Sequence, residues 1–280
     1  MTSAREPGRG GAVRLRSAAV RDLPGDPGLA PTELVSARGS YVGTPPPKRI
    51  ARFANEPRLD RLLLELHRGF GLQRWWPART PFEVLAGAIL TQGTSWSNVE
   101  RALANVAALI PITPANLLHA DEAQLRAALV PSGYYNVKLK KLAAVSRWYL
   151  DAGGLPALRE RALRPLRDEL LGVWGVGPET ADSILCYAAG RRTAVVDAYT
   201  RRILARHGLL AFDAPYETIR AWLEERLCAS QFAFEEMHAL FVRAGYRNCK
   251  PKPACAGCPA TTPIALRAGP GEARANGYTP

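Results

Sequence analysis

The sequence is short of several features that mark common classes of protein. No apolar run approaches the length that spans a bilayer, and no apolar segment of signal-peptide type follows the arginines near the N-terminus. We therefore expect no membrane association and a cytoplasmic location, at the nucleoid if the source is bacterial. Alternating strand patterns are almost absent and no internal repeat recurs at a fixed period, which argues against sheet and solenoid folds.

What the sequence does have is an excess of basic side chains. Its 280 residues include 37 Lys and Arg against 25 Asp and Glu, which gives a formal net charge of +12 and a pI near 9.9. A balance of this size favours binding to polyanions, because each phosphate contact releases counterions. Apolar residues make up 47% of the chain, which is enough for a substantial core. We also expect the protein to be a monomer.

Two tails flank a helical centre. Residues 1–54 are rich in proline, glycine and charge and are predicted to be disordered, and residues 261–280 form a similar flexible tail. One helix start is well marked, because Thr80 is a predicted N-cap, Pro81 fits the first turn and Glu83 is placed to reach back. The helical period then recurs along the chain and predicts an all-α protein. The helices predicted after this one span 96–109, 121–129, 136–151, 155–172, 178–189, 197–207, 215–228 and 232–246.

A glycine hairpin separates two of these helices. Residues 175–177 read Gly-Val-Gly, which breaks a helix, and Pro178 suits the first turn of the next one. The N–H groups at such a helix start bind phosphate, and without side chains at Gly175 and Gly177 a nucleic-acid backbone can approach closely. Taken alone, the segment also fits an ordinary helix corner whose glycines only permit the turn.

An acidic residue and a cysteine cluster follow the hairpin. Asp197 comes after Ala194-Val195-Val196, about twenty residues beyond Gly177, and closely spaced cysteines lie farther along. In this order the three features resemble the helix-hairpin-helix of the endonuclease III superfamily of DNA glycosylases, over roughly residues 58–258. The resemblance implies two helical lobes with a DNA-binding cleft between them and a C-terminal Cys-rich loop.

The resemblance also implies how the chain is divided. A six-helix lobe covers residues 80–196 and includes the helix-hairpin-helix at about 166–189. A second helical lobe joins residues 55–79 to residues 197–260, which contain the cysteine loop. A damaged base flipped out of double-stranded DNA is expected in the cleft between the lobes.

Asp197 is the catalytic residue that the resemblance implies. A carboxylate beside the sugar stabilises the oxocarbenium-like charge that develops as the N-glycosidic bond breaks, and it helps to activate water. The competing role is to cap the helix that follows, which an Asp in this position does well. Both roles are compatible, because capping would fix the orientation of the carboxylate.

Glu179 departs from part of the family. Bifunctional members have a lysine two residues after the second hairpin glycine, and its amine forms a Schiff base with the sugar. Glutamate cannot form an imine, so the sequence predicts a monofunctional glycosylase without AP lyase activity. The nearest other amines, Lys138, Lys140 and Lys141, match no motif.

Several segments resemble the 3-methyladenine glycosylase branch of the superfamily. Trp75, Trp76 and Trp96 match aromatic residues that line the base pocket in that branch, and Glu179 completes the implied pocket. An alkylated purine carries positive charge, so electron-rich aromatic faces attract it. The competing role of the tryptophans is packing between the lobes.

Two loops and the hairpin are expected to contact the duplex. Gln92 matches a polar residue near the space that the flipped base vacates. Tyr134 resembles the wedge of an inserting loop, with Asn136 as a cap or phosphate contact and Lys138 as a phosphate contact. The alternative for this loop is a helix N-cap at Asn136 behind a surface aromatic. The remaining implied DNA contacts lie in the hairpin: Gly175, Val176, Gly177 and Thr180.

Five cysteines occur, and three of them resemble the family's [4Fe–4S] loop: Cys249, Cys255 and Cys258. The family has a fourth cysteine, but Ile264 stands at its place and no Cys or His follows Cys258. A cluster with a non-cysteine or distant ligand, a lost cluster and a structural zinc site therefore all stay open. Cys228 and His238 are candidate ligands only if the fold brings them close.

Three other functions fit the same residues. One is a bifunctional endonuclease III-like glycosylase and AP lyase that acts on oxidised pyrimidines, and another is a mismatch-directed glycosylase. The third is a DNA-binding homologue that has lost turnover. Base release that Asp197→Asn abolishes would favour an enzyme over a binding module.

Overall fold

The computed structural model describes residues 43–261, and this part of the chain is helical. Within it, the β-pairing consists of one isolated antiparallel bridge, Ala54 to Leu227. The predicted all-α fold is therefore confirmed. The α-helices are α2 (Pro57–Phe70), α3 (Pro81–Leu90), α4 (Trp96–Leu109), α5 (Pro114–His119), α6 (Glu122–Leu129), α7 (Tyr135–Asp151), α8 (Gly154–Glu160), α9 (Leu163–Gly172), α10 (Pro178–Ser183), α11 (Ala198–Arg206), α12 (Tyr216–Arg226) and α13 (Gln231–Arg247). Short helical turns are η1 (Val130–Ser132), η2 (Ile184–Ala188), which is π-helical, and η3 (Cys255–Gly257).

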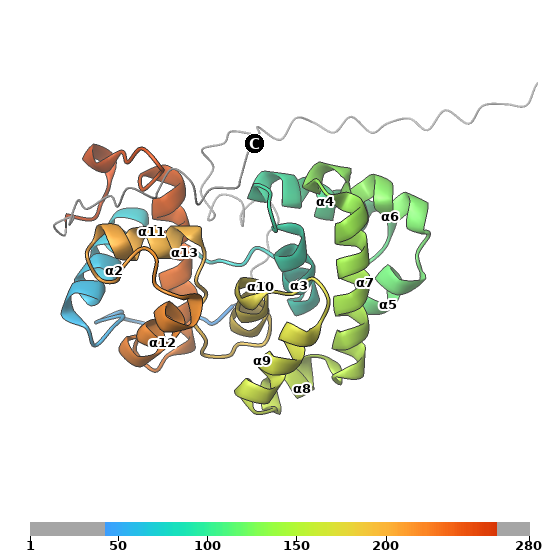
Figure 1. Ribbon diagram of the computed structural model, residues 1–280, viewed down its shortest axis with the longest axis horizontal. Coiled ribbons are helices and arrows are strands. Elements are labelled where there is room, and N and C mark those ends of the chain that lie inside the picture. Colours follow the sequence, from blue (N-terminus) through green and yellow to red (C-terminus); the bar gives the residue numbers. More distant parts are fainter. Residues whose placement is uncertain (1–42, 262–280) are drawn as a thin grey trace, which may run out of the picture.

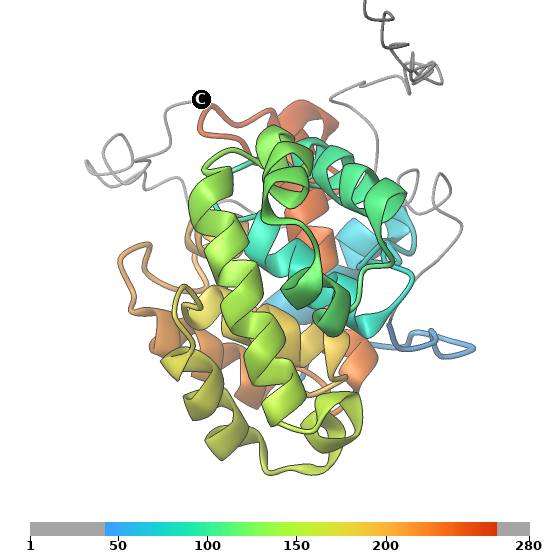
Figure 2. The same ribbon diagram turned by 90° about the vertical axis from the view of Figure 1, so that its right-hand side faces the viewer.

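Figure 1 shows these helices gathered into two groups, which we call the central lobe and the terminal lobe. The central lobe contains α3 to α10, and the terminal lobe contains α2 together with α11, α12 and α13. Helices α4 to α7 form the outer wall of the central lobe (Figure 2). The η2 segment packs against α3 on one side and α13 on the other, so it lies where the lobes meet.

Helix starts follow local capping. The Thr80 hydroxyl accepts a hydrogen bond from Glu83 N at 3.1 Å, and Pro81 occupies the first turn of α3, as predicted. The Glu83 carboxylate in turn accepts from the backbone N of Arg79 at 2.7 Å. These contacts satisfy donors that a helix start leaves without intrahelical partners.

The predicted helix at 155–172 is in fact two helices, α8 and α9, with Arg161 at the break. The physical reason is local, because Pro165 has no N–H to donate to the Arg161 carbonyl and its ring clashes with that carbonyl. The guanidinium of Arg191 donates to the carbonyls of Leu158, Arg159 and Arg161, and so satisfies the carbonyls at the end of α8. The proline is a signal that helical periodicity alone does not register.

A buried ion pair fastens the two helices of the hairpin motif to each other. Arg167 on α9 donates from Nε and Nη2 to the two carboxylate oxygens of Asp182 on α10, at 2.8 and 2.9 Å. The Tyr216 hydroxyl, from the terminal lobe, donates to the same Asp182 at 2.9 Å. The orientation of the hairpin relative to the terminal lobe is therefore fixed by polar contacts as well as by the core.

The packed part of the chain begins earlier than predicted. Residues 43–54 were assigned to the disordered tail, but Phe53 and Ala54 are buried, and Phe53 N donates to Asp60 Oδ1 at 2.6 Å. The Thr44 hydroxyl donates to Glu235 Oε1 at 3.0 Å. Residues 1–42 and 262–280, which hold the rest of the two predicted tails, lie outside the described residues.

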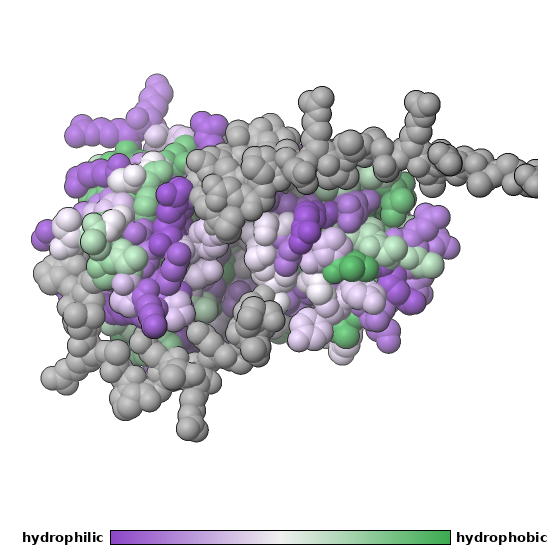
Figure 3. Space-filling model, turned by 90° about the horizontal axis from the view of Figure 1, so that it is seen from above, coloured by the Kyte–Doolittle hydropathy of each residue, from purple (hydrophilic) through white to green (hydrophobic). Residues whose placement is uncertain are grey.

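The outer surface mixes polar and apolar residues on the face that Figure 3 shows. Figure 3 shows hydrophobic residues scattered among hydrophilic ones on the upper face of both lobes. In residues 43–261, every helix is too short or too polar to cross a lipid bilayer. The large apolar side chains with the most exposure in this range are Tyr134, at 77%, and Trp174, at 57%, both on the central lobe.

Candidate functional site

Asp197 is held at the start of α11 by two contacts. Its Oδ1 accepts a hydrogen bond from Thr200 N at 2.7 Å, and so caps the helix. Its Oδ2 lies 3.7 Å from His238 Nε2 on α13, and the side chain is 13% exposed. The capping role that competed with catalysis is therefore present, and it leaves the second carboxylate oxygen turned toward His238.

His238 is itself fixed by Tyr187. Its Nδ1 lies 2.7 Å from the Tyr187 hydroxyl, which also donates to the Glu235 carbonyl oxygen at 3.0 Å. His238 and Tyr187 are both buried. A rigid chain of side chains, which the sequence did not reveal, thus orients the carboxylate of Asp197.

The two acids near this point have separated pKa values. Burial opposes ionisation of Asp197, but hydrogen bonding and attraction from His238, with help from Thr200, hold the pKa of its carboxyl below the usual value. Burial and, second, the negative charge of Asp197 raise the pKa of Glu179 to about 7. Glu179 keeps an exposed surface, so solvent or a ligand reaches it. Such a pair suits chemistry that needs one ionised acid and one that titrates near neutral pH.

Three tryptophans form an aromatic cluster beside this site. The ring centroids of Trp75, Trp76 and Trp96 lie 4.8 to 5.3 Å apart, and Trp76 also meets the ring of Tyr187 at 5.5 Å. Trp75 and Trp76 are buried and Trp96 is half-buried. The buried indole N–H groups of all three find no hydrogen-bond partner among the described residues. The cluster therefore joins the chain of side chains that orients Asp197, and it packs the region where the lobes meet.

The two hairpin glycines differ in what the fold requires of them. Gly175 has a φ of 85°, and an added Cβ would lie 2.4 Å from Lys141 Cγ, so both backbone and packing require glycine. Gly177 has an ordinary φ of −97°, and among the described residues no neighbouring atom lies within 4 Å of an added Cβ. The fold itself therefore does not require glycine at 177, and this part of the backbone is open to an approaching partner.

Gln92 ties the end of α3 to the hairpin. Its Nε2 donates to Gly175 O at 3.0 Å and to Thr180 Oγ1 at 2.9 Å, and its Oε1 accepts from Lys141 Nζ at 2.6 Å. Thr180 and Val176, which we expect to contact DNA, are both buried. The Thr180 hydroxyl is already engaged by Gln92 within the protein.

The loop around Tyr134, which we expect to insert into DNA, differs from the prediction in its helix cap. Tyr134 has a φ of 44° and stands at the cap of α7, so the alternative cap at Asn136 is wrong; Asn136 lies exposed in the first turn. Lys138 was expected to contact phosphate, but it is 2% exposed and its Nζ donates to Leu90 O and Ser132 O at 2.7 and 2.5 Å. Burial, and then the charge of a neighbouring lysine, lower the pKa of Lys138 to about 8. Its ammonium holds the loop in place.

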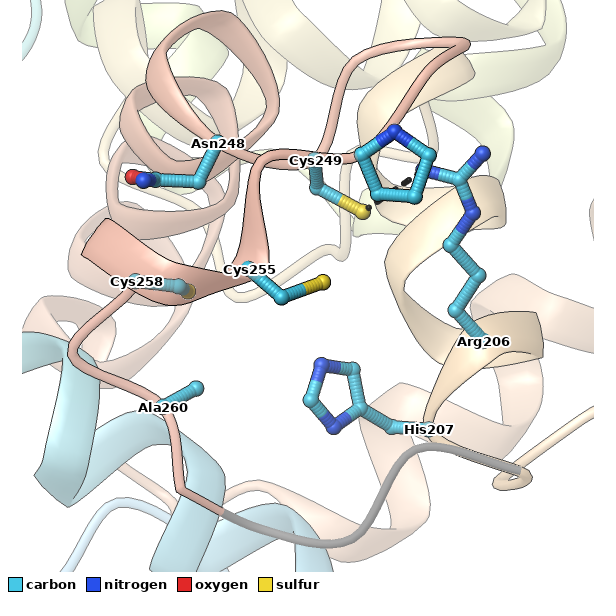
Figure 4. Close-up of a pocket in the computed structure, with 8 residues that line it drawn as sticks. Arg206, His207, Asn248, Cys249, Cys255, Cys258 and Ala260 are labelled. Atoms are coloured by element: carbon cyan, nitrogen blue, oxygen red, sulfur yellow. Dashed lines mark hydrogen bonds between the residues drawn. The ribbon is translucent and has the colours of Figure 1, made fainter. Parts of the chain in front are cut away.

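Cys249, Cys255 and Cys258 line one cavity at the far end of the terminal lobe (Figure 4). Figure 4 also shows His207, from the end of α11, directed toward the same space. Arg206 Nη1 donates to Cys249 Sγ at 3.3 Å. Between residues 43 and 261, no group of three or more His, Cys, Asp or Glu side chains is arranged to hold a single metal ion.

The distant ligands considered from the sequence do not line this cavity. His238 contacts Asp197 and Tyr187 instead, and the Cys228 thiol lies 3.9 Å from the carbonyl of Arg52. Ile264 lies outside the described residues. His207 was missed because neither its neighbours nor its spacing from the cysteines forms a motif. The exposed Trp174, directly before the hairpin, was missed as well.

Comparison with known proteins agrees with this geometry. Residues 86–228 match the model of the family described as HhH-GPD superfamily base excision DNA repair protein. The chain belongs to this superfamily. A protein of Methanocaldococcus jannaschii, named as a DNA repair glycosylase, is 42% identical over 205 residues, which cover 72% of this chain and 92% of that protein. Endonuclease III of Thermotoga maritima is 30% identical over 181 residues, covering 64% and 79% of the two chains.

Solved structures share the fold of this glycosylase. The 3-methyladenine DNA glycosylase of H. pylori bound to 1,N6-ethenoadenine has a TM-score of 0.55 at 23% identity, over 77% of this chain and 97% of that one. A non-covalent endonuclease III–DNA complex has a TM-score of 0.59 at 22% identity, over 70% and 89% of the chains. The protein is thus a DNA glycosylase of the base excision repair type.

Proposed function

We propose that this glycosylase is monofunctional and hydrolyses the N-glycosidic bond of an alkylated purine flipped out of double-stranded DNA. The observation that carries the proposal is the pairing of acids. Asp197, held by Thr200 N and His238, has Glu179 rather than an amine as the charged neighbour that shapes its surroundings. This arrangement supports the attack of water over the attack of a lysine.

Asp197 acts on the sugar in this proposal. As the bond to the base breaks, positive charge develops on the deoxyribose, and an ionised carboxylate beside it lowers the energy of that state. The lowered pKa of Asp197 keeps the carboxyl ionised at neutral pH. The same carboxylate accepts a proton from the water that adds to the sugar carbon, and the base leaves with the electron pair of the broken bond.

The lysines of the central lobe support the same choice. Lys138 is buried between two carbonyl oxygens, and Lys141 donates to Gln92, so both amines are already engaged within the protein. A Schiff base requires an uncharged, accessible amine at the sugar. Glu179 occupies the position where the family's bifunctional members carry that amine.

The aromatic cluster favours an alkylated purine as the base. An alkylated purine carries positive charge, and tryptophan faces attract cations. Trp96, which is half-buried, is the member of the cluster with a partly exposed ring. The buried indole N–H groups of the three tryptophans are donors for the acceptor atoms of a base. The H. pylori neighbour, which is described with 1,N6-ethenoadenine, indicates that this fold accommodates a modified purine. Such a base is also a good leaving group, so modest catalysis is enough.

The hairpin supplies the DNA contact in this proposal. Free N–H groups at the start of α10, around Gly177, suit a backbone phosphate of the duplex. Tyr134, exposed at the tip of its loop, is placed to insert between base steps, as wedge residues do. The net charge of +12 adds general attraction to the phosphate backbone.

The cysteine loop fits the iron–sulfur cluster that the family resemblance implies. The thiols of Cys249, Cys255 and Cys258 line one cavity, and this cavity also has a buried nitrogen of His207 without a hydrogen-bond partner. Thiolates of this kind hold a [4Fe–4S] cluster, which would cross-link the loop to the terminal lobe. We propose that the protein binds this cluster as a structural element.

A lesion panel under single-turnover conditions tests the function. We expect release of 3-methyladenine or 7-methylguanine from duplex DNA, no strand nicking and no adduct trapped by borohydride. Glu179→Lys is the positive control for trapping, since it restores an amine at the family position. Release of thymine glycol with a trapped wild-type adduct would favour the bifunctional enzyme. Equal binding of all duplexes without release of any base would favour a binding module.

A further inference from the structure

His207 is a buried histidine with a side-chain nitrogen that no described residue satisfies. It caps the C-terminal end of α11 and is 6% exposed. Its Nδ1 is buried and has no hydrogen-bond partner among the described residues. An unpaired buried polar atom costs free energy, so natural proteins rarely keep one without a ligand, an ion or a water to satisfy it. The ring lines the same cavity as Cys249, Cys255 and Cys258.

We propose that His207 is the fourth ligand of the iron–sulfur cluster held by Cys249, Cys255 and Cys258. This inference rests on the proposal above that the cysteine loop binds a cluster, and it names the ligand that replaces the missing fourth cysteine. Histidine is a known cluster ligand in proteins, where it takes the place of cysteine on an iron.

Two backbone contacts hold His207 in position for this role. Its N–H donates to Ile203 O at 3.0 Å, which keeps it in the last turn of α11. Its carbonyl oxygen accepts from Arg58 Nη2 at 2.5 Å, and the same guanidinium donates to Gly208 O at 3.2 Å. The end of α11 is thereby joined to α2, so the ring projects from a fixed helix end, as a metal-site ligand should.

The cysteine loop is tied to the same helix. Arg206 donates to the carbonyls of Lys250 and Pro251, at 2.6 and 2.9 Å, and Arg202 Nε donates to Cys249 O at 2.6 Å. Arg206 also contacts the Cys249 sulfur at 3.3 Å. Consecutive residues of α11 thus bind the loop and present the fourth donor.

The loop is also seated on α2 from the other side. An added Cβ at Gly69 would lie 2.2 Å from Pro259 Cβ, so Pro259 rests directly on the backbone of α2. The Thr261 amide and hydroxyl donate to the Glu65 carboxylate at 2.7 and 2.8 Å. These contacts place Cys258 next to the end of α11 by anchoring the residues that follow it.

A cluster and a single ion make different demands on these donors. Among residues 43–261, no group of three or more His, Cys, Asp or Glu side chains is arranged to hold a single metal ion. In a [4Fe–4S] cluster each ligand binds a different iron, so the donors stand farther apart around a larger body. A tetrahedral zinc site would instead need all four donors close to one point.

Metal analysis of the full-length protein tests the ligand set. The protein is purified anaerobically with 15N-labelled histidine or without label, reconstituted with iron and sulfide, and assayed for both elements. Wild type is expected to bind about four irons and about four sulfides per chain. Pulsed EPR of the paramagnetic cluster should show a nitrogen coupling that changes with the 15N label.

Two variants and a control separate ligation from folding. His207→Cys restores four thiolates, so it should keep the iron and lose the nitrogen coupling. His207→Ala should lose at least about one iron in four. His119→Ala removes an exposed histidine at the end of α5 and should match wild type. Far-UV circular dichroism checks the helical fold of each variant.

Three results would overturn the inference. They are full iron content with an unchanged nitrogen coupling in His207→Ala, one zinc per chain without sulfide in wild type, and iron-free wild type after reconstitution with its helical signal intact. All these readouts are made without DNA. A negative result for His207 as a ligand therefore does not contradict the proposed glycosylase function. A protein that binds iron but releases no base would contradict the proposed function and leave the ligand assignment standing.

Discussion

The two ends of α11 carry the two candidate sites, and they are built in different ways. At the N-terminal end, Asp197 is bonded to Thr200 N and oriented by His238, so protein atoms alone set its geometry. At the C-terminal end, the buried Nδ1 of His207 has no partner within the described residues, and the three cysteines converge on the same cavity. About 15 Å of helix separates the two ends. The comparison predicts that chemistry depends on the first end and metal content on the second.

The largest expected effect is at Asp197. Asp197→Asn removes the negative charge but keeps a side-chain oxygen for the helix cap, so the fold should persist. Single-turnover release of 3-methyladenine should fall by about 10²- to 10⁴-fold, the range seen when a charge-stabilising or basic group is lost. Iron content and duplex affinity should stay at wild-type levels.

Asp213→Asn is the matched control for this change, because Asp213 is an exposed acid outside both sites. It should leave base release unaltered. If Asp197→Asn retained rapid release, or if it lost iron together with activity, the two ends of α11 would not have the separate roles that we predict.

The second-largest expected effect concerns the Gly-Val-Gly hairpin at residues 175–177. Gly177→Ala adds a methyl group where the protein has open space and an ordinary φ, so the fold should persist. A small loss of thermal stability is expected, because glycine is a better N-cap for α10 than alanine. An approaching phosphate would meet that methyl group, and loss of one charge-assisted hydrogen bond should weaken duplex binding about tenfold. Fluorescence anisotropy with labelled duplex measures the affinity.

Gly172→Ala provides the control, since Gly172 ends α9 and also has open space around an added Cβ. It should bind DNA like wild type. Equal affinity of the two variants would argue against a phosphate at Gly177.

The helical fold was easier to predict from the sequence than the surroundings of the two candidate sites. Periodicity, caps and the Gly-Val-Gly hairpin are local signals, so they located most helices. Asp197 was singled out by the family resemblance, and its catalytic role stays a prediction. The break at Arg161 was open to prediction, because Pro165 cannot bond the carbonyl four residues before it. The core position of Phe53 was not, because its neighbours are rich in proline and charge.

Side-chain roles that depend on distant partners were the least predictable. A lysine in such a loop is typical of a phosphate contact, but the ammonium of Lys138 donates to two backbone carbonyls instead. His238 was considered as a metal ligand and lies instead against Asp197, because α13 packs along α11. His207 reaches the cysteines only because α11 ends where the loop returns. Each of these outcomes is set by tertiary packing, which one sequence without an alignment does not encode in readable form.

A smaller effect is the pH dependence of base release, which separates the roles of Asp197 and Glu179. The pKa of Glu179 is raised to about 7, whereas that of Asp197 is lowered, so Asp197 stays ionised while Glu179 loses its proton as pH rises through neutrality. A second negative charge near a cationic base and sugar should raise the rate of 3-methyladenine release several-fold between about pH 6 and about pH 8. Glu179→Gln cannot ionise and should give a flat profile over that window. An identical rise in this variant would assign the titration to another group.

The smallest effect tests whether the two ends of α11 are independent. His207→Ala should lose iron, yet it should lower base release by no more than about threefold, because other contacts hold the helix. Arg201 bonds the carbonyls of Phe212 and Ala214, and Arg58 bonds the backbone oxygen at position 207, which the substitution keeps. Tyr199 also packs so closely on Gly245 of α13 that an added Cβ would lie 2.2 Å from its ring. These contacts fix the first turn of α11, and therefore Asp197, without help from the cysteine loop. A loss of release as large as that of Asp197→Asn, with the helical signal intact, would mean that the group bound at the far end aligns the carboxylate through the helix.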